Sequence, residues 1–251
     1  MTQETHFGFK KVSESDKARL VSDVFRSVAS KYDLMNDLMS GGLHRLWKDE
    51  LIKMLRPRAN MHLLDLAGGT GDIARRFLDA THGMTPEAKV TICDINAAML
   101  SEGRTNLTNK GYLKRIDFIQ GDATCLPFED QSFDAVTISF GLRNVANFER
   151  ALAEIYRVLK VGGSFYCLEF SKINNPLLRT AYQTYAFSVI PTVGQIVAKD
   201  RESYQYLIES IEQFPDQATL AAMMQAVGFR EVAWRDLTFG VCAIHSGLRL
   251  A

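Results

Sequence analysis

The sequence predicts an α/β fold built on a mostly parallel sheet, and three observations lead to this prediction. Apolar runs alternate with amphipathic segments through the middle of the chain. The first run leads into a glycine-rich turn within the stretch MHLLDLAGGTGDIA, residues 61–74. Two further apolar runs, separated by a short turn, close the chain. The stretch 61–74 has the pattern of a buried strand, a tight turn and the start of a helix.

The elements of the predicted sheet follow in chain order. Strand-like runs occupy residues 61–66, 89–93, 116–120, 134–140 and 163–169. Helix-like segments at 71–80, 97–109 and 147–159 separate most of them, and such alternation is typical of right-handed β-α units with helices on both faces. The connection DATCLPFEDQS is expected to be a loop because it contains Pro127 and a polar cluster. The segment FREVAWRDLTFGVCAIHSGL predicts two strands that turn near Leu237 to Gly240.

The segments outside this alternation are harder to interpret. Residues 13–56 look helical, with Val21, Val24, Phe25 and Val28 on one face, so we expect an N-terminal helical cap over residues 1–56. The pattern fits a cap packed on the core as well as a lid that faces the substrate. Residues 171–200 contain few charges and read as an apolar insertion near the site, and residues 200–227 are helical again. We find no linker, so residues 1–251 are predicted to form one domain.

Composition excludes several classes of protein. The chain has 251 residues, 47% of them hydrophobic and 23% charged, so a sizeable core is expected. Lys+Arg and Asp+Glu both number 29, which removes the electrostatic case for nucleic acid. The four cysteines lack CxxC spacing, so we expect reduced thiols of a cytoplasmic protein and no metal site. No apolar stretch reaches the roughly 20 residues that span a bilayer; peripheral contact with the inner membrane stays open.

Two classes of ligand compete for the glycine turn. Residues 69–74 fit the dinucleotide pattern GxGxxA, and Asp94 follows at about the offset of a ribose-binding acid, so an NAD-dependent oxidoreductase is one alternative. However, Asp65, Asp72 and Asp122 surround the turn, and carboxylates disfavour a pyrophosphate. They favour a ligand with an ammonium or sulfonium group and hydroxyls, such as S-adenosylmethionine. Asp72 taken alone fits an ordinary first-turn acid equally well.

The motifs also resemble known families. LLDLAGGTGD, CDINAAML, GDATCLPF, SFDAVTISFGLRNV and LKVGGSFYCLEFSK are similar, in this order, to motifs of the class I methyltransferases. HFGFKKV, VFRSVASKYDLMNDLMSGGLHRLWK, TISFGLRNV, LEFSK and RESYQYLIESI resemble the UbiE/MenG family of quinone-biosynthesis C-methyltransferases over nearly the whole chain. Gly42 and Asp122 depart from the usual family residues. The resemblance implies a Rossmann-like, mostly parallel seven-stranded sheet with an antiparallel C-terminal strand and an N-terminal helical lid.

The resemblance also implies a cofactor, S-adenosyl-L-methionine, which leaves as S-adenosyl-L-homocysteine. Thr70 would lie against its methionine part, and Asp94 would bind the ribose hydroxyls with its two acceptor oxygens. Asp122 and Ala123 would lie at the adenine, and Ser139 near the transferable methyl group. The predicted cofactor-binding residues are therefore Asp65, Gly68, Thr70, Asp94, Asp122, Ala123 and Ser139.

The reaction implied by the resemblance is methylation of a ring carbon of a prenylated quinol. An aromatic carbon becomes nucleophilic once a neighbouring hydroxyl loses its proton, and a phenol has a pKa of about 10. A quinone lacks that hydroxyl and should not react. Our hypothesis is that Arg143 and Asn144 stabilise the developing phenolate, and that Tyr32 contacts substrate or cofactor. The general base stays open among His44, Asp33, His245 and water.

Partners stay open as well. The prenyl tail needs an apolar path, which residues 176–198 and the N-terminal helices are expected to supply. The same surface fits contact with a membrane, a homodimer interface or an ordinary packed subdomain. A non-catalytic scaffold of a quinone-synthesis complex is a further alternative function. The sequence does not distinguish a benzoquinol from a naphthoquinol substrate.

Overall fold

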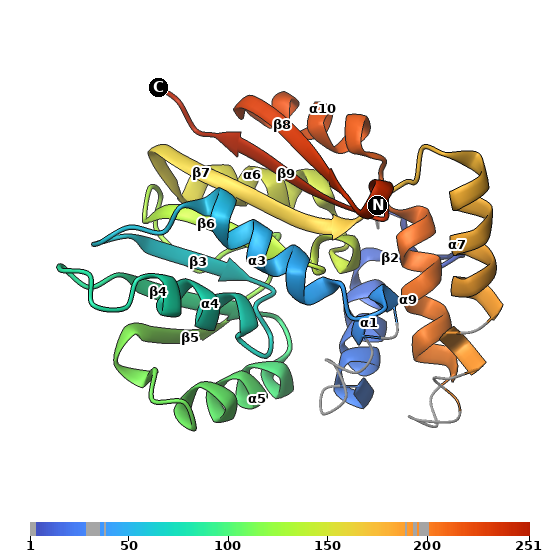
Figure 1. Ribbon diagram of the computed structural model, residues 1–251, viewed down its shortest axis with the longest axis horizontal. Coiled ribbons are helices and arrows are strands. Elements are labelled where there is room, and N and C mark those ends of the chain that lie inside the picture. The colour runs from blue at the N-terminus through green and yellow to red at the C-terminus, as the bar shows by residue number, and fades with distance from the viewer. Residues whose placement is uncertain (1–3, 29–35, 38, 189, 193–194, 196–200) are drawn as a thin grey trace.

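A seven-stranded mixed sheet forms the centre of the protein (Figure 1), seen in a computed structural model that describes residues 4–28, 36–37, 39–188, 190–192, 195 and 201–251. The strand order is β5-β4-β3-β6-β7-β9-β8, and β9 runs antiparallel to both of its neighbours. This arrangement confirms the predicted mostly parallel sheet with an antiparallel strand at the C-terminus. The strands are β3 (His62–Leu66), β4 (Lys89–Asp94), β5 (Ile116–Gln120), β6 (Phe133–Ser139), β7 (Leu159–Phe170), β8 (Arg230–Leu237) and β9 (Cys242–Leu248).

Helices cover both faces of the sheet because successive strand residues point to opposite sides. In β3, Leu63 packs into one hydrophobic cluster and Leu64 into the other, and both are fully buried. The cluster around Leu63 includes residues of α3 (His44–Leu55), α4 (Asp72–Ala80) and α5 (Ala97–Thr108). The cluster around Leu64 includes residues of α6 (Phe148–Val158) and α10 (Gln217–Val227).

Further elements gather at the end of the sheet where the parallel strands finish (Figure 1). They are the hairpin of β1 (Glu4–Phe7) and β2 (Lys10–Ser13), then α1 (Glu14–Val28), α7 (Pro176–Ser188) and α9 (Arg201–Gln213). The Phe7 ring stacks on Tyr206 of α9 with ring centroids 4.0 Å apart, so the hairpin is fastened to that helix. The sequence analysis did not foresee this hairpin.

The predicted strands and helices of the central alternation are confirmed to within a few residues at their ends, except that β7 begins four residues before the predicted 163. The loop predicted after β5 is also confirmed, since no helix occurs between Gln120 and β6. The helical stretch 200–227 is divided at Pro215. There the Asp216 side chain accepts a hydrogen bond from the Thr219 N–H at 2.8 Å and caps α10. Short 3₁₀ turns are η2 (Leu113–Arg115), η3 (Leu142–Asn144) and η4 (Thr238–Gly240).

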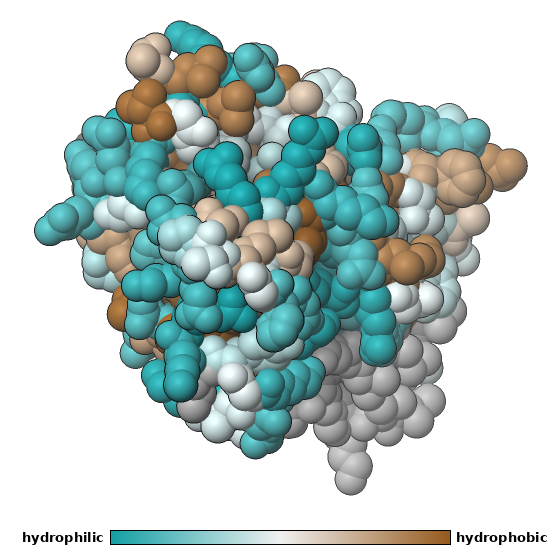
Figure 2. Space-filling view, turned by 60° about the vertical axis from the view of Figure 1, so that its left-hand side comes forward, coloured by the Kyte–Doolittle hydropathy of each residue, from teal (hydrophilic) through white to brown (hydrophobic). Residues whose placement is uncertain are grey.

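Polar and apolar side chains both reach the surface of the described residues. The face in Figure 2 is largely hydrophilic and carries small, separate groups of apolar side chains. Leu177 at the start of α7 is 79% exposed, whereas Ala186 near its end is buried. Within the part of the chain that the structure describes, no helix combines the length and the apolar character needed to cross a membrane.

Candidate active site

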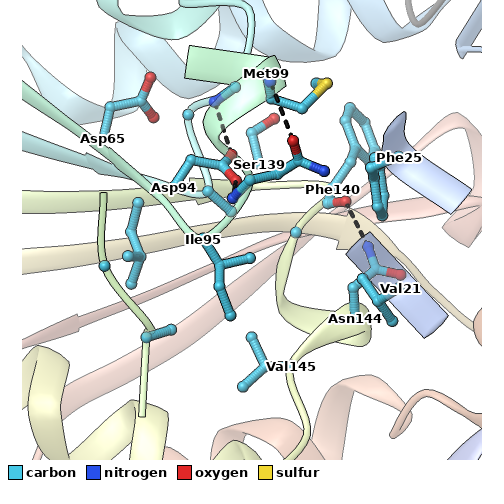
Figure 3. Close-up of a pocket in the computed structure, with 18 of the residues that line it drawn as sticks. Val21, Phe25, Asp65, Asp94, Ile95, Met99, Ser139, Phe140, Asn144 and Val145 are labelled. Atoms are coloured by element: carbon cyan, nitrogen blue, oxygen red, sulfur yellow. Dashed lines mark hydrogen bonds between the residues drawn. The ribbon is translucent and has the colours of Figure 1, made fainter. Parts of the chain in front are cut away.

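A cleft opens at the carboxyl ends of β3, β4 and β6, where the order of the strands reverses. From β3 the chain builds outward through β4 to β5, then returns to place β6 on the other side of β3. The loops after β3 and β6 therefore diverge, and ligands of open α/β sheets bind at such a point. These loops, the ends of β4 and β5, and α1 line the cleft (Figure 3). Its empty space, including the part open to solvent, is about 1050 Å³.

The floor of the cleft is bare main chain. Gly71 ends the turn after β3 with φ of 77°, a conformation that side chains other than glycine rarely adopt. Helix α5 packs directly on this turn through Gly103, where an added Cβ would lie 2.3 Å from the Gly69 carbonyl oxygen. The α4 N-terminus, with its free N–H groups, opens from the same turn. A ligand can therefore lie against the backbone, as the glycine pattern predicts.

Asp94 ends β4 and ties the turn to the next helix (Figure 3). Its Oδ2 accepts a hydrogen bond from the Gly69 N–H at 3.0 Å, and its Oδ1 accepts one from the Asn96 N–H at 2.9 Å. Burial raises the pKa of the Asp94 carboxyl to about 6. Asn96 in turn caps α5 and donates from Nδ2 to the Ser22 carbonyl oxygen of α1 at 3.1 Å. The sequence analysis missed Asn96, although its place just before a helix is a capping signal.

Two buried polar atoms at the cleft have no hydrogen-bond partner among the described residues. One is Asp65 Oδ2; the other oxygen, Oδ1, accepts a hydrogen bond from Thr137 Oγ1 at 3.0 Å. The second is Ser139 Oγ at the end of β6. Burial raises the pKa of the Asp65 carboxyl to about 7. An unsatisfied buried polar group costs about 1–3 kcal/mol, so both positions suit a polar ligand with ammonium and hydroxyl groups.

A comparison with known proteins identifies the family. A model of the ubiE/COQ5 methyltransferase family matches residues 10–249. The chain belongs to this family. It is 55% identical to the ubiquinone/menaquinone biosynthesis C-methyltransferase UbiE of Paracoccus denitrificans over 248 residues, which cover 99% of this chain and 98% of that protein. It is 50% identical to the mitochondrial 2-methoxy-6-polyprenyl-1,4-benzoquinol methylase of Dictyostelium discoideum, covering 99% of this chain and 87% of that one.

Solved structures agree on the fold of this methyltransferase. A SAM-dependent methyltransferase from Aquifex aeolicus matches with a TM-score of 0.58 and 14% identity, over 81% of this chain and 89% of that one. A putative methyltransferase from Bacillus halodurans matches with a TM-score of 0.57 and 18% identity, over 81% of this chain and 99% of that one. With its family and fold known, the chain is an S-adenosylmethionine-dependent C-methyltransferase.

All seven residues predicted to bind the methyltransferase cofactor line the cleft. Asp122, after β5, is held by Thr124, whose N–H and Oγ1 donate to Asp122 Oδ1 at 2.8 and 2.9 Å. Asp72 lines the cleft too, but it is also one end of a charge network. Although burial opposes its ionisation, Lys48 and Arg76 hold the pKa of Asp72 well below its usual range. Asp72 is therefore an ion-paired residue as well as an acid in the first turn of α4.

Asn144 lines the cleft and its amide is held in one orientation. Its Oδ1 accepts a hydrogen bond from the Tyr206 hydroxyl at 3.0 Å, and its Nδ2 donates to the Phe140 carbonyl oxygen at 3.5 Å (Figure 3). Phe140 has φ of 58°, which is uncommon for a residue with a side chain and directs this loop toward the cleft. Val145 follows on the same wall, so Asn144 is a polar group between apolar neighbours.

Arg143 is not among the described residues that line the cleft, so its role in stabilising the phenolate stays a prediction. Its side chain is 1% exposed, as is that of Glu169, and the two form an ion pair with Nη1 and Oε1 2.6 Å apart. The same Nη1 donates to the Phe140 carbonyl oxygen at 2.8 Å. Arg143 is thus absent from the described lining of the cleft and supports its wall. The sequence analysis missed Glu169, although a carboxylate inside the apolar run of β7 was a visible signal.

Neither histidine considered as a general base is among the described residues that line the cleft. His44 Nε2 pairs with Asp37 Oδ1 at 2.9 Å, and burial is the main cause that lowers its pKa. His245 of β9 is buried with its Nε2 3.0 Å from the Gln217 carbonyl oxygen. Tyr32 and Asp33 lie outside the described residues. The general base of the methyltransferase therefore stays a prediction, and so does the role of Tyr32.

Proposed function

We propose that this chain transfers a methyl group from S-adenosylmethionine to a ring carbon of a prenylated quinol in ubiquinone or menaquinone biosynthesis. The names of the two relatives support this substrate class. The observation that carries the proposal is the cleft itself. It brings all the predicted cofactor-binding residues onto one surface with the polar group of Asn144. Apart from the pattern at residues 69–74 and the offset of Asp94, no described feature favours a dinucleotide, and none favours a purely structural role.

The residues of the cleft fit the cofactor. Asp94 offers carboxylate oxygens for two ribose hydroxyls, and its hydrogen bonds from Gly69 and Asn96 leave room for further acceptance, since each oxygen has two lone pairs. Asp122 and Ala123 lie beyond it for the adenine. Ser139 Oγ, which is buried and has no hydrogen-bond partner in the described part of the chain, lies at the end of β6 and lines the same cleft as Asn144. When bound, S-adenosylmethionine supplies an activated methyl group on a sulfonium.

Asn144 is the group that we assign to the quinol oxygen. The Tyr206 hydroxyl donates to Oδ1, and one N–H of Nδ2 donates to the Phe140 carbonyl oxygen. Because Asn144 lines the cleft, we assign its second N–H to the substrate. Such a donor stabilises the negative charge that grows on the ring oxygen as the neighbouring carbon becomes nucleophilic. Arg143 then acts as a positioning residue, since its guanidinium donates to the same Phe140 carbonyl oxygen and so helps to hold the loop that carries Asn144.

Apolar side chains frame the other side of the cleft. Val21 and Phe25 of α1 face Ile95 and Val145 across it (Figure 3). A flat aromatic ring can lie between such surfaces, and burial of apolar area contributes about 25 cal/mol per Å². We propose that α1 is the described part of the lid and of the path for the prenyl tail. No described residue of 171–200 lines the cleft, so the role of that segment stays a prediction.

The test is transfer of a labelled methyl group from S-adenosylmethionine to two substrates, each reduced and oxidised. The substrates are demethylmenaquinol and a 2-methoxy-6-polyprenyl-1,4-benzoquinol. Transfer to the reduced rings and none to the quinones would support the phenolate mechanism. Comparison of the two reduced substrates would show whether the enzyme accepts a benzoquinol, a naphthoquinol or both. Tight binding of S-adenosylhomocysteine without transfer to either ring would refute the proposed substrate class. Absence of cofactor binding would refute the cofactor assignment.

A further inference from the structure

The cleft contains an imbalance of charge at the start of α4. Four carboxylates line it, Asp65, Asp72, Asp94 and Asp122, whereas Lys48 is the single cation in the described lining. The amino-acid end of the proposed cofactor carries both an ammonium and a carboxylate. Carboxylates on the protein attract the ammonium group but repel the carboxylate of the ligand. A site of this composition therefore needs a cation where the carboxylate of the ligand lies.

Lys48 is placed to be that cation. It comes from α3, which packs against α4, and its side chain is 5% exposed. Its Nζ donates to Asp72 Oδ2 at 3.0 Å, and within the described part of the chain Asp72 is its one hydrogen-bond partner. An ammonium has three N–H donors, so two remain for other acceptors. Burying an ammonium with donors unused is costly, which favours a further anionic partner in the cleft.

The alternative is that Lys48 serves only as the counter-ion of Asp72. Asp72 is already paired by Arg75 and Arg76, whose nitrogens donate to Oδ1 at 3.0 and 3.2 Å. These two arginines continue outward to Asp79 and Asp49, at the surface. Lys48 approaches the other oxygen of Asp72 and is the cation of this network that lines the described cleft together with Thr70. Lys48 also favours the ionised form of Asp65, so it serves two carboxylates at this turn and still has donors directed to the cleft that they line.

We infer that the Lys48 ammonium binds the carboxylate at the amino-acid end of the cofactor, with Asp72 holding the ammonium in place. Asp65 Oδ2, which is buried and has no hydrogen-bond partner among the described residues, is the matching acceptor for the neighbouring ammonium of the ligand. The inference rests on the proposed cofactor and adds a determinant of its recognition. It predicts that the enzyme distinguishes ligands by the presence of this one carboxylate.

The experiment compares two unreactive ligands by calorimetry, S-adenosylhomocysteine and its decarboxylated analogue. The parent enzyme should bind S-adenosylhomocysteine about 10- to 100-fold more tightly than the analogue, as expected for one charge-assisted hydrogen bond. Lys48→Met should weaken binding of S-adenosylhomocysteine to the level of the analogue and leave the analogue unchanged. Lys48→Arg should retain part of the preference. Lys53→Met, on the same helix at a side chain that is 73% exposed, is the matched control and should bind like the parent.

Each result decides the question. Equal binding of both ligands by the parent enzyme would overturn the role of Lys48 while leaving the cofactor assignment intact, and so would a Lys48→Met variant that keeps the full preference. Binding of neither ligand by the parent would overturn the proposed cofactor instead. Should Lys48→Met fail to fold by circular dichroism, Lys48→Gln replaces it, because its amide can still donate to Asp72. Its affinity ratio is judged by the same criteria.

Discussion

The buried pair of Arg143 and Glu169 gives the sharpest test of how the cleft wall is held. We predict that Glu169→Gln lowers the free energy of unfolding by about 3–5 kcal/mol, the usual cost of leaving one member of a buried ion pair without its partner. Glutamine keeps the size of the side chain and an oxygen that accepts from Arg143 and from the Phe170 N–H. The loss therefore comes mainly from the missing charge, because a guanidinium cannot relieve its burial by losing a proton. A smaller part comes from the weak hydrogen bond that Oε2 accepts from the Arg143 N–H at 3.4 Å, which an amide nitrogen cannot accept.

Urea unfolding of the ligand-free protein, followed by far-ultraviolet circular dichroism, measures this loss. Thermal unfolding gives a second measure of the same loss. For a chain of this size about 1 kcal/mol corresponds to a shift in Tm of about 2–4 °C, so Tm should fall by about 6–20 °C. The matched control is Glu154→Gln, since Glu154 pairs with Arg157 and their side chains are 21% and 30% exposed. A pair that still reaches solvent contributes less than a fully buried one, so this variant should lose clearly less stability than Glu169→Gln.

The double variant Arg143→Met with Glu169→Leu separates charge from packing. Apolar residues of similar volume often replace a buried ion pair without loss of stability, so we expect most of the lost stability to return. The double variant should still turn over more slowly than the parent enzyme, because it lacks the contact from Arg143 to the Phe140 carbonyl oxygen. A Glu169→Gln variant that loses less than about 1 kcal/mol, or no more than Glu154→Gln, would refute the reasoning.

Three further predictions concern the cleft. Asn144→Ala should lower kcat about 100-fold, typical for loss of one donor to a developing oxyanion, with the Kd of S-adenosylhomocysteine within about threefold of the parent; equal losses in both would contradict its role. Since burial raises the pKa of Asp94 to about 6, S-adenosylhomocysteine should bind more weakly as the pH falls through that value, because a protonated carboxyl loses acceptor capacity. The sign for stability is opposite: with the folded pKa above the usual 3.8, the cost of ionising Asp94 is present above about pH 6 and disappears toward pH 4, so urea unfolding should show no matching loss from this group. Gly103→Ala should cost about 1–3 kcal/mol of stability and weaken binding of S-adenosylhomocysteine, because its Cβ would lie 2.3 Å from the Gly69 carbonyl oxygen. Unchanged affinity by calorimetry and unchanged urea unfolding would contradict this, and would show that α5 shifts to make room for the added methyl group.

Much of the cofactor site was predictable because it is built from short local patterns. A buried strand, a glycine turn and a helix start follow one another in residues 61–74, and each is encoded within a few residues. Asp65 and Asp94 come at the ends of strands, and parallel strands align their carboxyl ends at one edge of the sheet. The resemblance to a family then pointed to Asp122, Ala123 and Ser139, and the structure places them on the same cleft.

The hairpin and the partners of the wall were not predictable in the same way. The strands β1 and β2 have four residues each and show no buried face of their own, so their periodicity carries little signal. They are held by the stacking of Phe7 on Tyr206, a residue about 200 positions later in the chain. No local pattern reports such a contact, because it exists only once the chain has folded.

The sequence by itself determined the strand–turn–helix at the centre of the chain, the type of sheet and the carboxylates at the ends of its strands. Only the tertiary structure decided which way the polar residues beyond those strands face. Arg143 and Asn144 are neighbours in the chain, yet the first is buried against Glu169 and the second lines the cleft. Likewise, only the packing of α3 on α4 brings Lys48 to Asp72. The physical reason is that a side chain's direction in a loop depends on the partners available in space, which the order of residues along the chain does not specify.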